Sequence, residues 1–356
     1  MHRKQAPAKR FGSTDSNDGA NTHIDIHFFP GWPWGRQEIF RMTLEPSKPA
    51  DLRKRARALV IRRLAAGGLI VLAGVLVVLI FAGAFLTYRI TTTHDTSEDV
   101  TPAAYLLSSY ESVNFTDSNG TQHQGWLLIG LRDAPVVILC HGYNSNRSAL
   151  LSLGTVLQAN HFNVYLFNFD GSPPKDYFSN LGVNEASVLS AAIARVEKLP
   201  GVNPHRIGLY GDSLGAYACL VASERHPEVA ALALDNAYSQ PAQLLDVQLD
   251  RLVGGAGPLF RLLCRVEFRL LTVSTAYPDV QAGLSSLAGR PKLFLASDEA
   301  PMLESSTRRL YQDAPFPKRL VVLPHTEGEI VSGPERKEYE DQVLTFFLRN
   351  LPLRSD

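Results

Sequence analysis

The chain has 356 residues, a mass of 39.2 kDa and a formal net charge of zero. Its hydrophobic content of 45% allows a sizeable core, and the zero net charge excludes bulk electrostatic attraction to nucleic acid. The three cysteines, Cys140, Cys219 and Cys264, are odd in number and lack metal-ligand spacing. The sequence therefore predicts no disulfide framework and no metal site, and nothing in it calls for a cofactor.

Residues 1–63 are predicted to form an N-terminal tail. The composition of residues 1–20 is polar and rich in Lys, Arg, Ser, Asp and Asn, which is typical of disorder. Residues 23–41 differ because they carry Phe and Trp side chains close together. Two interpretations of this aromatic segment stay open: an interfacial segment lying on a membrane, or a partly ordered tail.

A continuous apolar stretch begins at Leu64, ends at Tyr88 and contains no charged residue. At a rise of about 1.5 Å per residue it is long enough to cross a hydrocarbon core of about 30 Å. A secretory signal would start nearer the N-terminus and be shorter, and a buried globular helix would show a polar stripe. The stretch therefore predicts a single transmembrane helix whose partner is the lipid bilayer.

The charges that flank this helix predict its orientation. Six basic residues precede it, and after it come Arg89 and then the acidic residues Asp95, Glu98 and Asp99. Because basic flanks stay on the cytoplasmic side, the N-terminal tail is expected inside the cell. Everything after Tyr88 is then expected on the periplasmic or extracellular side, with residues 89–104 as a polar linker. The preceding basic residues are Arg53, Lys54, Arg55, Arg57, Arg62 and Arg63.

From about Tyr105 to the end of the chain, strand and helix patterns alternate. An Asn119-Gly120 pair between two extended segments predicts a hairpin. Strands alternating with helices predict a parallel sheet covered on both faces. The later strands are expected at residues 136–140, 163–169, 207–210, 229–234, 292–296 and 320–323, and the helices at 148–158, 185–197, after 213, and at 337–350.

One connection in this domain is unusually long. About fifty residues, 236–290, separate two predicted strands, which is far more than an ordinary connection needs. The segment is rich in Leu, Phe and Arg at helical spacing. We expect helices that form a cap over the carboxyl edge of the sheet; the alternative is a crossover helix followed by a long loop.

The stretch from Arg206 to Gly215 carries the strongest chemical signal. A short apolar strand runs directly into Gly211-Asp212-Ser213-Leu214-Gly215, and small helix-compatible residues follow. A serine at the apex of a sharp strand-to-helix turn needs small neighbours, and Gly211 and Gly215 provide them. This context identifies the pattern as a nucleophile elbow rather than an ordinary turn.

The hairpin, the strand leading into His141-Gly142, the elbow and the closing helix together resemble the α/β-hydrolase family. The likeness is nearest to its serine aminopeptidase-like and prolyl-oligopeptidase-like branch, which includes membrane-anchored hydrolases, and it covers about residues 105–353. It implies a mostly parallel central sheet, helices on both faces and a helical cap. It also implies Ser213 as nucleophile, and an oxyanion hole made by the backbone N–H groups of Leu214 and Tyr143. His141 is expected to be a structural loop residue.

The same resemblance implies a base and an acid in the chain order serine, acid, histidine. Only His226 and His325 follow the elbow. His226 precedes the next strand and has the wrong order, so His325 is the candidate base. The acid should follow strand 292–296, which favours Asp298.

Two alternative acids stay open, Glu299 beside Asp298 and Asp235 after the preceding strand. The sequence also departs from the family pattern, because strict counting places Ala300 at the acid position and puts His325 early. Shortened loops would bring Asp298 and His325 into register.

The sequence thus predicts a membrane-anchored serine hydrolase that cleaves an ester, thioester or amide of a small-molecule or peptide acyl substrate through an acyl-enzyme. Two rival functions remain. One is a catalytically degenerate, hydrolase-like binding domain, which would not react with a fluorophosphonate at Ser213. The other is an acyltransferase, which would use the same serine with an acceptor other than water.

Overall fold

The computed structural model describes residues 22–24, 42–44, 49–92, 100–105, 109–171, 178–297, 301–325 and 333–353. Asp298, Glu299 and most of the aromatic segment lie outside the described residues. The chain divides into two compact units, Met1–Val77 and Val78–Asp356.

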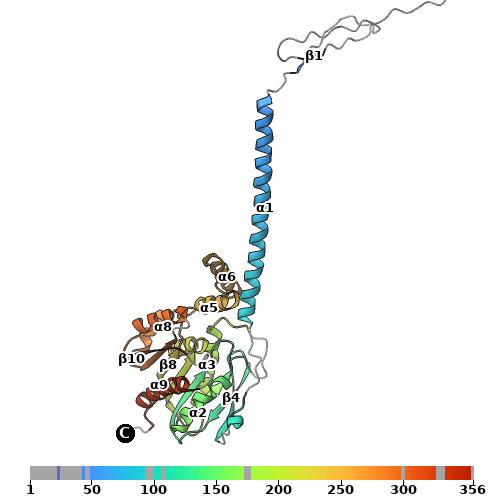
Figure 1. Cartoon of the computed structure of the whole chain (residues 1–356). Helices are drawn as coiled ribbons and strands as arrows, with labels where there is room; N and C mark the ends of the chain where they lie inside the picture. The colour runs from blue at the N-terminus through green and yellow to red at the C-terminus, as the bar shows by residue number, and fades with distance from the viewer. Residues whose placement is uncertain are drawn as a thin grey trace, which may run out of the picture. The chain divides into compact units, whose positions relative to one another are not determined.

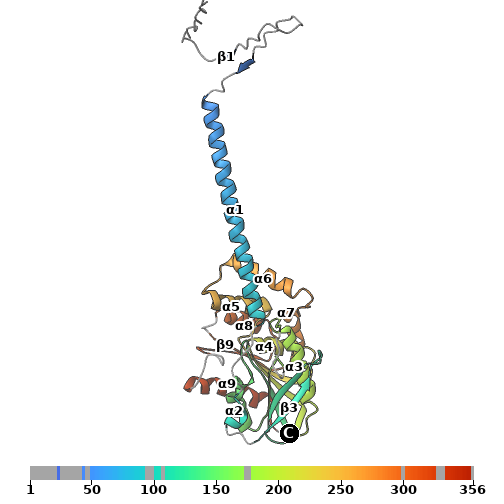
Figure 2. The ribbon, with the colours of Figure 1, turned by 90° about the vertical axis from the view of Figure 1, so that its right-hand side faces the viewer.

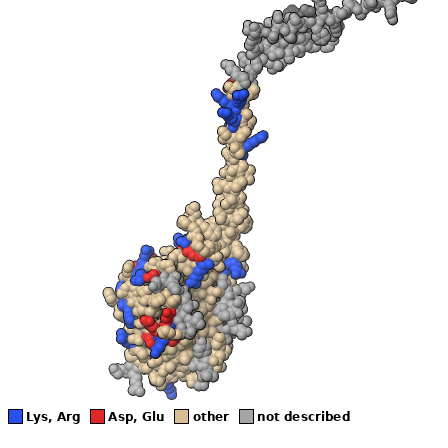
Figure 3. All heavy atoms as spheres, in the orientation of Figure 1, with Lys and Arg blue, Asp and Glu red and all other residues tan. Residues whose placement is uncertain are grey.

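The first unit contains a short antiparallel strand pair and most of a long helix. Strand β1 (Thr22–Ile24) pairs with β2 (Met42–Leu44), and helix α1 (Pro49–Thr91) begins here. Its apolar side chains are exposed, including Ile70 at 72% and Val71 at 67%. Within the described part of the chain, α1 is the one helix long and apolar enough to cross a membrane. Lys and Arg side chains gather near its start, as Figure 3 shows.

The second unit is built on an eight-stranded sheet with the order β10-β9-β8-β7-β5-β6-β4-β3 (Figures 1 and 2). The pairs β3–β4 and β4–β6 are antiparallel and all other pairs are parallel. The strands are β3 (Tyr110–Thr116), β4 (Gln122–Leu128), β5 (Ala134–Cys140), β6 (Asn163–Phe167), β7 (Val202–Asp212), β8 (Val229–Asp235), β9 (Lys292–Ser297) and β10 (Lys318–Leu323).

Helices cover both faces of this sheet because its central strands are apolar on both sides. In β5, Val136 and Ile138 join one core cluster, whereas Val137 and Leu139 join the other, as the period of two in a strand requires. The first cluster includes helices α3 (Val183–Val196) and α4 (Leu214–Ser223), and the second includes α2 (Leu151–Ala159) and α9 (Pro334–Asn350). This is the mostly parallel, two-faced architecture that the sequence predicts.

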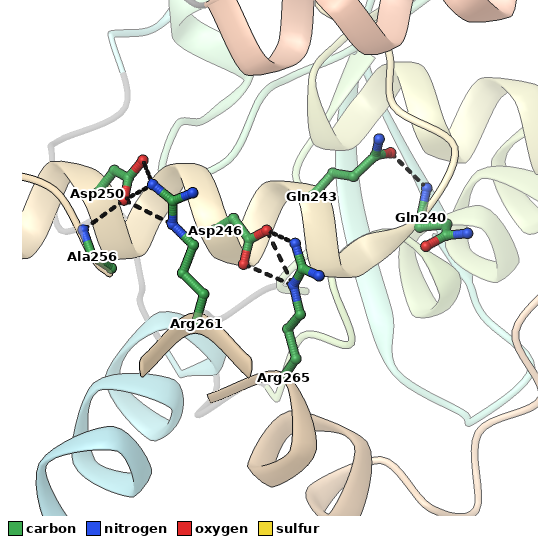
Figure 4. A network of polar contacts seen from close by, with 7 residues as sticks. All are labelled: Gln240, Gln243, Asp246, Asp250, Ala256, Arg261 and Arg265. Atoms are coloured by element: carbon green, nitrogen blue, oxygen red, sulfur yellow. Dashed lines mark hydrogen bonds and ion pairs between the residues drawn. The ribbon is translucent and has the colours of Figure 1, made fainter. Parts of the chain in front are cut away.

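The long connection between β8 and β9 is helical. It contains α5 (Pro241–Val253), α6 (Pro258–Leu271), α7 (Val280–Gly283) and the short 3₁₀ helix η3 (Leu284–Leu287). Two ion pairs join α5 to α6, as Figure 4 shows: Arg261 with Asp250 at 2.6 Å, and Arg265 with Asp246. We call α5, α6 and α7 the cap helices.

Three features differ from the sequence-based expectations. Helix α1 begins at Pro49, within the segment expected to be an N-terminal tail, and not at Leu64. Helix α8 (Pro301–Asp313) follows β9, where the sequence analysis placed no element. Helix α1 also continues to Thr91, into the segment expected to be a linker, and Ile90 and Thr91 are each only 1% exposed. The reason is tertiary: the Tyr143 hydroxyl donates to the Ile90 carbonyl at 2.9 Å, and the Ser179 N–H donates to the Thr91 carbonyl at 2.8 Å.

Candidate active site

Ser213 lies at the apex of the turn between β7 and α4, in a strained backbone conformation. Its φ is +47° and its ψ is −99°, which a residue with a Cβ adopts only when its surroundings enforce it. The Ser213 N–H donates to the Asp235 carbonyl at 2.8 Å, which ties the turn to the end of β8. This geometry is that of a nucleophile elbow.

The two elbow glycines are required by close backbone approach. A Cβ at Gly211 would overlap the backbone of Gly215, and a Cβ at Gly215 would overlap the carbonyl of Cys140. The chain therefore crosses itself at a distance that only glycine permits. The predicted spacing of glycines around Ser213 has a direct steric cause.

The predicted oxyanion-hole residues follow adjacent parallel strands. Strand β5 pairs with β7 in the register Cys140↔Gly211, so Tyr143 and Leu214 both come shortly after the same edge of the sheet. Leu214 is the first residue of α4, and the first N–H groups of a helix have no intrahelical acceptor. The helix dipole at that end also favours negative charge. The Leu214 N–H is therefore a suitable donor for a developing oxyanion at this edge.

The imidazole of His141 contacts backbone on both sides. Its Nδ1 lies 3.0 Å from the Gly142 carbonyl, and the Phe169 N–H donates to its Nε2 at 3.3 Å. The side chain is 7% exposed. These contacts fit the structural loop role expected for His141.

His325 comes directly after the last strand of the sheet, two residues beyond Leu323. Hydrogen bonds connect the loops between Ser213 and this position. The Ser297 N–H donates to the Asn236 Oδ1 at 3.4 Å, and the Ser297 hydroxyl donates to the Pro324 carbonyl at 2.9 Å. The structure thus brings the elbow and His325 to the same carboxyl edge of the sheet.

Among the described residues, the carboxylate beside His325 is that of Glu335, which the sequence analysis did not predict. The Glu335 Oε2 lies 3.0 Å from the His325 Nδ1, and Glu335 is in the first turn of α9. The chain order serine, acid, histidine excludes any residue after His325 as the acid. Pro334, a typical first residue of a helix, is the sequence signal that places Glu335 beside the preceding loop.

Asp235, one of the alternative acids, is fully buried at the end of β8. Its Oδ2 accepts a hydrogen bond from the Tyr339 hydroxyl at 2.7 Å, and Tyr339 contacts the Tyr210 hydroxyl at 2.6 Å. This network connects β7 and β8 to α9 beneath the site. The Asp235 side chain therefore connects β8 to α9, and its backbone carbonyl accepts the hydrogen bond from the Ser213 N–H at the elbow.

Two aromatic side chains, one from α4 and one that follows β8, stack close to the elbow. Tyr217, one turn after Ser213, stacks on Tyr238 with ring centroids 5.1 Å apart. Burial raises the pKa of both phenols well above the ordinary range for tyrosine. Both rings therefore stay neutral at physiological pH.

A cavity of about 630 Å³ opens among the cap helices. It is lined by the start of α5, by α6 and by Arg309 of α8, and its polar groups include Arg265, Arg269 and Asp279. Among the described residues, no group of three His, Cys, Asp or Glu side chains is placed to hold a metal ion. The cavity is of a size that accepts a small organic ligand.

Comparisons with known proteins define the fold. No family model matches the chain. It is 28% identical over 253 residues to the uncharacterized protein YfhR of Escherichia coli (strain K12), covering 68% of this chain and 82% of that one. It superposes on the esterase Pf2001 of Pyrococcus furiosus with a TM-score of 0.56 at 18% identity, covering 74% of this chain and 98% of that one.

A second solved structure that it resembles is a membrane phospholipase A described as a novel bacterial virulence factor. The TM-score is 0.51 at 19% identity, and the match covers 81% of this chain and 99% of that one. The structural neighbours are α/β-hydrolases, and the chain has the α/β-hydrolase fold.

Proposed function

We propose that this chain is a membrane-anchored serine hydrolase that cleaves an ester, thioester or amide through an acyl-enzyme on Ser213. The observation that carries the proposal is the positive φ of Ser213 on a turn whose glycines permit no side chain. Backbone strain of this kind costs of order 1–3 kcal/mol and persists mostly where function uses it. The hydrolase names of the structural neighbours support the same reaction class.

The proposed reaction has two stages. The Ser213 Oγ attacks the carbonyl carbon of the substrate while His325 takes the hydroxyl proton, and the oxyanion faces the N–H groups of Leu214 and Tyr143. The bond to the leaving group then breaks, and the leaving group takes the proton from His325. Water attacks the acyl-enzyme by the same steps in reverse, releasing the acid and regenerating the serine.

A base is required because a serine hydroxyl stays protonated at neutral pH. His325 is the proposed base on the basis of its place after β10. Asp298 is the proposed orienting acid, since it directly follows β9. The serine aminopeptidase-like and prolyl-oligopeptidase-like branch is the proposed relationship within the fold.

The site is tested by labelling the full chain with a fluorophosphonate. Ser213→Ala should abolish labelling, and His325→Ala should reduce its rate nearly as far, because members of a triad act as a unit. Ser223→Ala, in the same helix, is the matched control and should label normally. A folded, unsubstituted chain that neither labels nor turns over any ester would favour the binding-domain function instead.

The acyltransferase alternative is separated by its products. With a labelled ester and a mixture of water and small alcohol or amine acceptors, a hydrolase releases mainly the free acid. Transfer of most of the acyl group to an acceptor at low acceptor concentration would contradict hydrolysis as the main reaction.

We further propose that α1 anchors the enzyme in a bilayer with its N-terminus in the cytoplasm. Exposed Leu, Ile and Val side chains along α1 and the basic cluster at its start support this proposal (Figure 3). Alkaline extraction should leave the full chain in the membrane pellet. Recovery in the supernatant would contradict anchoring.

The contacts of Ile90 and Thr91 predict where a detached domain must begin. A fragment that begins at Leu86 keeps the buried Ile90 side chain and the two carbonyls that accept from Tyr143 and Ser179. A fragment that begins at Thr92 loses all three and should be about 3–4 kcal/mol less stable. Urea unfolding of both fragments in mild detergent measures the difference, and equal stability would contradict this boundary.

A further inference from the structure

Helix α6 of the cap carries an apolar stripe on its outer face. Five side chains recur along it at intervals of three or four residues, which places them on one side of the helix. Their exposed fractions are high: Leu259 81%, Leu262 57%, Val266 49%, Leu270 67% and Val273, just past the helix, 76%. A cap helix facing water would normally carry polar residues here.

The opposite face of α6 is already occupied, so the stripe is not the side that packs on the domain. Cys264 and Phe268 are buried in the core. Arg261 and Arg265 reach back to Asp250 and Asp246 of α5, as Figure 4 shows. These contacts fix the rotation of α6 about its own axis, so that the apolar stripe faces away from the domain.

Helix α6 lies against the last turns of α1, within the same unit of the chain. A Cβ at Gly83 would come within 2.6 Å of the Glu267 Oε2, and the fully buried Thr87 lies beside Cys264. From Gly83 to Tyr88, the end of the apolar stretch, the helix axis advances only about 7.5 Å, since each residue adds ~1.5 Å. An amphipathic helix at a membrane surface typically lies about 5–10 Å into the headgroup and acyl boundary.

We propose that α6 is an interfacial membrane helix that sinks its Leu259–Val273 stripe into the leaflet next to the end of α1. The inference rests on the proposed anchoring by α1. Gly83 lies inside the apolar stretch of α1, so in an anchored chain lipid surrounds α1 at this residue. For that reason we infer that a bilayer, rather than a second copy of the chain, covers the stripe. Arg269 flanks the stripe, with its guanidinium 4.8 Å from the centre of the Tyr277 ring. A long basic side chain in that position reaches lipid phosphates while its stem stays in the apolar layer.

The consequence is a cap whose outer side meets lipid and whose inner side lines a cavity. Phe268, on the face of α6 opposite the stripe, belongs to the lining of the 630 Å³ cavity described above. A substrate dissolved in the leaflet would therefore meet the cap before it meets bulk water.

The test uses the full chain in nanodiscs of phosphatidylcholine and phosphatidylglycerol, with an environment-sensitive NBD probe on one introduced cysteine. Leu262→Cys reports the stripe, Leu72→Cys in α1 reports the anchor, and Leu348→Cys in α9 is the control. All three target side chains are exposed, at 57%, 65% and 40%. The native cysteines are buried, and the unsubstituted chain corrects for any labelling of them.

Doxyl spin labels near the headgroup end of the acyl chain should quench the Leu262→Cys probe, and its emission should shift to the blue. Spin labels near the methyl end should quench the Leu72→Cys probe, and the Leu348→Cys probe should respond to neither. Quenching of the Leu72→Cys probe without quenching of the Leu262→Cys probe would overturn the proposal of an interfacial helix but not the proposal that α1 anchors the chain. An unquenched Leu72→Cys probe would overturn anchoring itself. A blue shift at Leu262→Cys without quenching, growing with protein concentration, would mean that protein rather than lipid covers the stripe.

Discussion

The pairing of His325 with Glu335 leads to a prediction about which carboxylate matters for catalysis. Glu335→Gln keeps the size of the side chain and removes its charge. The two groups are 3.0 Å apart, but Glu335 is 57% exposed and His325 is 34% exposed. Ion pairs exposed to solvent to this degree contribute about 0–1 kcal/mol, because water screens the attraction and ordering the side chains costs entropy.

One kcal/mol corresponds to about a fivefold change in rate. We therefore expect Glu335→Gln to lower kcat/KM by no more than about fivefold. Asp298→Asn should have a far larger effect if Asp298 orients the imidazole; the comparable change in a well-studied serine protease triad costs about 10⁴ in kcat. Glu299→Gln and Asp235→Asn test the two alternative acids.

The assay combines hydrolysis of a water-soluble p-nitrophenyl ester with the rate of fluorophosphonate labelling, so that an effect on the nucleophile is separated from an effect on the leaving group. Thermal unfolding of each variant checks that it is folded. A loss of about a hundredfold or more in Glu335→Gln, with normal unfolding, would refute the screening argument, since about 2.7 kcal/mol exceeds what an exposed pair supplies. Glu335 would then be the orienting acid and the prediction of Asp298 would be wrong.

Three further predictions concern stability and orientation. Tyr339→Phe removes the hydroxyl that donates to the buried Asp235 carboxylate and should lower the free energy of unfolding by about 1.5–3 kcal/mol. Tyr210→Phe removes a hydrogen bond between two neutral hydroxyls and should cost about 1 kcal/mol; equal costs in urea unfolding would contradict this. Burial lowers the pKa of Lys292 to about 8, so above that pH the unfolded chain binds a proton that the folded chain does not, and the free energy of unfolding should rise between about pH 8 and pH 10. A Lys292→Met variant should lack this rise. The same rise in the variant would mean that other groups cause it. Protease added outside intact cells or spheroplasts should degrade the chain beyond Tyr88, and protection of that part with cleavage of the tail would reverse the proposed orientation.

The elbow is the part of the site that the sequence predicts best. Its geometry depends on local contacts, because Gly211 and Gly215 meet each other and Cys140 across one sharp turn. This steric requirement is visible in the sequence because the two glycines stand two residues before and two residues after Ser213. The alternating strands and helices are predictable for the same reason, since burial on two faces leaves apolar runs such as residues 136–140.

The acid beside His325 is harder to predict because it depends on loops rather than on strands. A one-residue change of loop length moves a carboxylate out of reach, and the sequence carries no periodic signal in such segments. Glu335 shows the difficulty, since it approaches His325 from the following helix and not from the preceding strand. The chain order that selects His325 over His226 also excludes Glu335.

The end of α1 shows a different limit of sequence reading. Composition predicts an apolar helix that ends near Tyr88 and a polar linker after it, because charged and hydroxyl residues follow. The helix continues to Thr91 because two groups distant in sequence, the Tyr143 hydroxyl and the Ser179 N–H, donate to its last carbonyls. Tyr143 is also the residue whose backbone N–H is proposed to bind the oxyanion. One residue thus links the loop of the proposed site to the final turn of α1, and a flexible hinge at that turn would break this hydrogen bond.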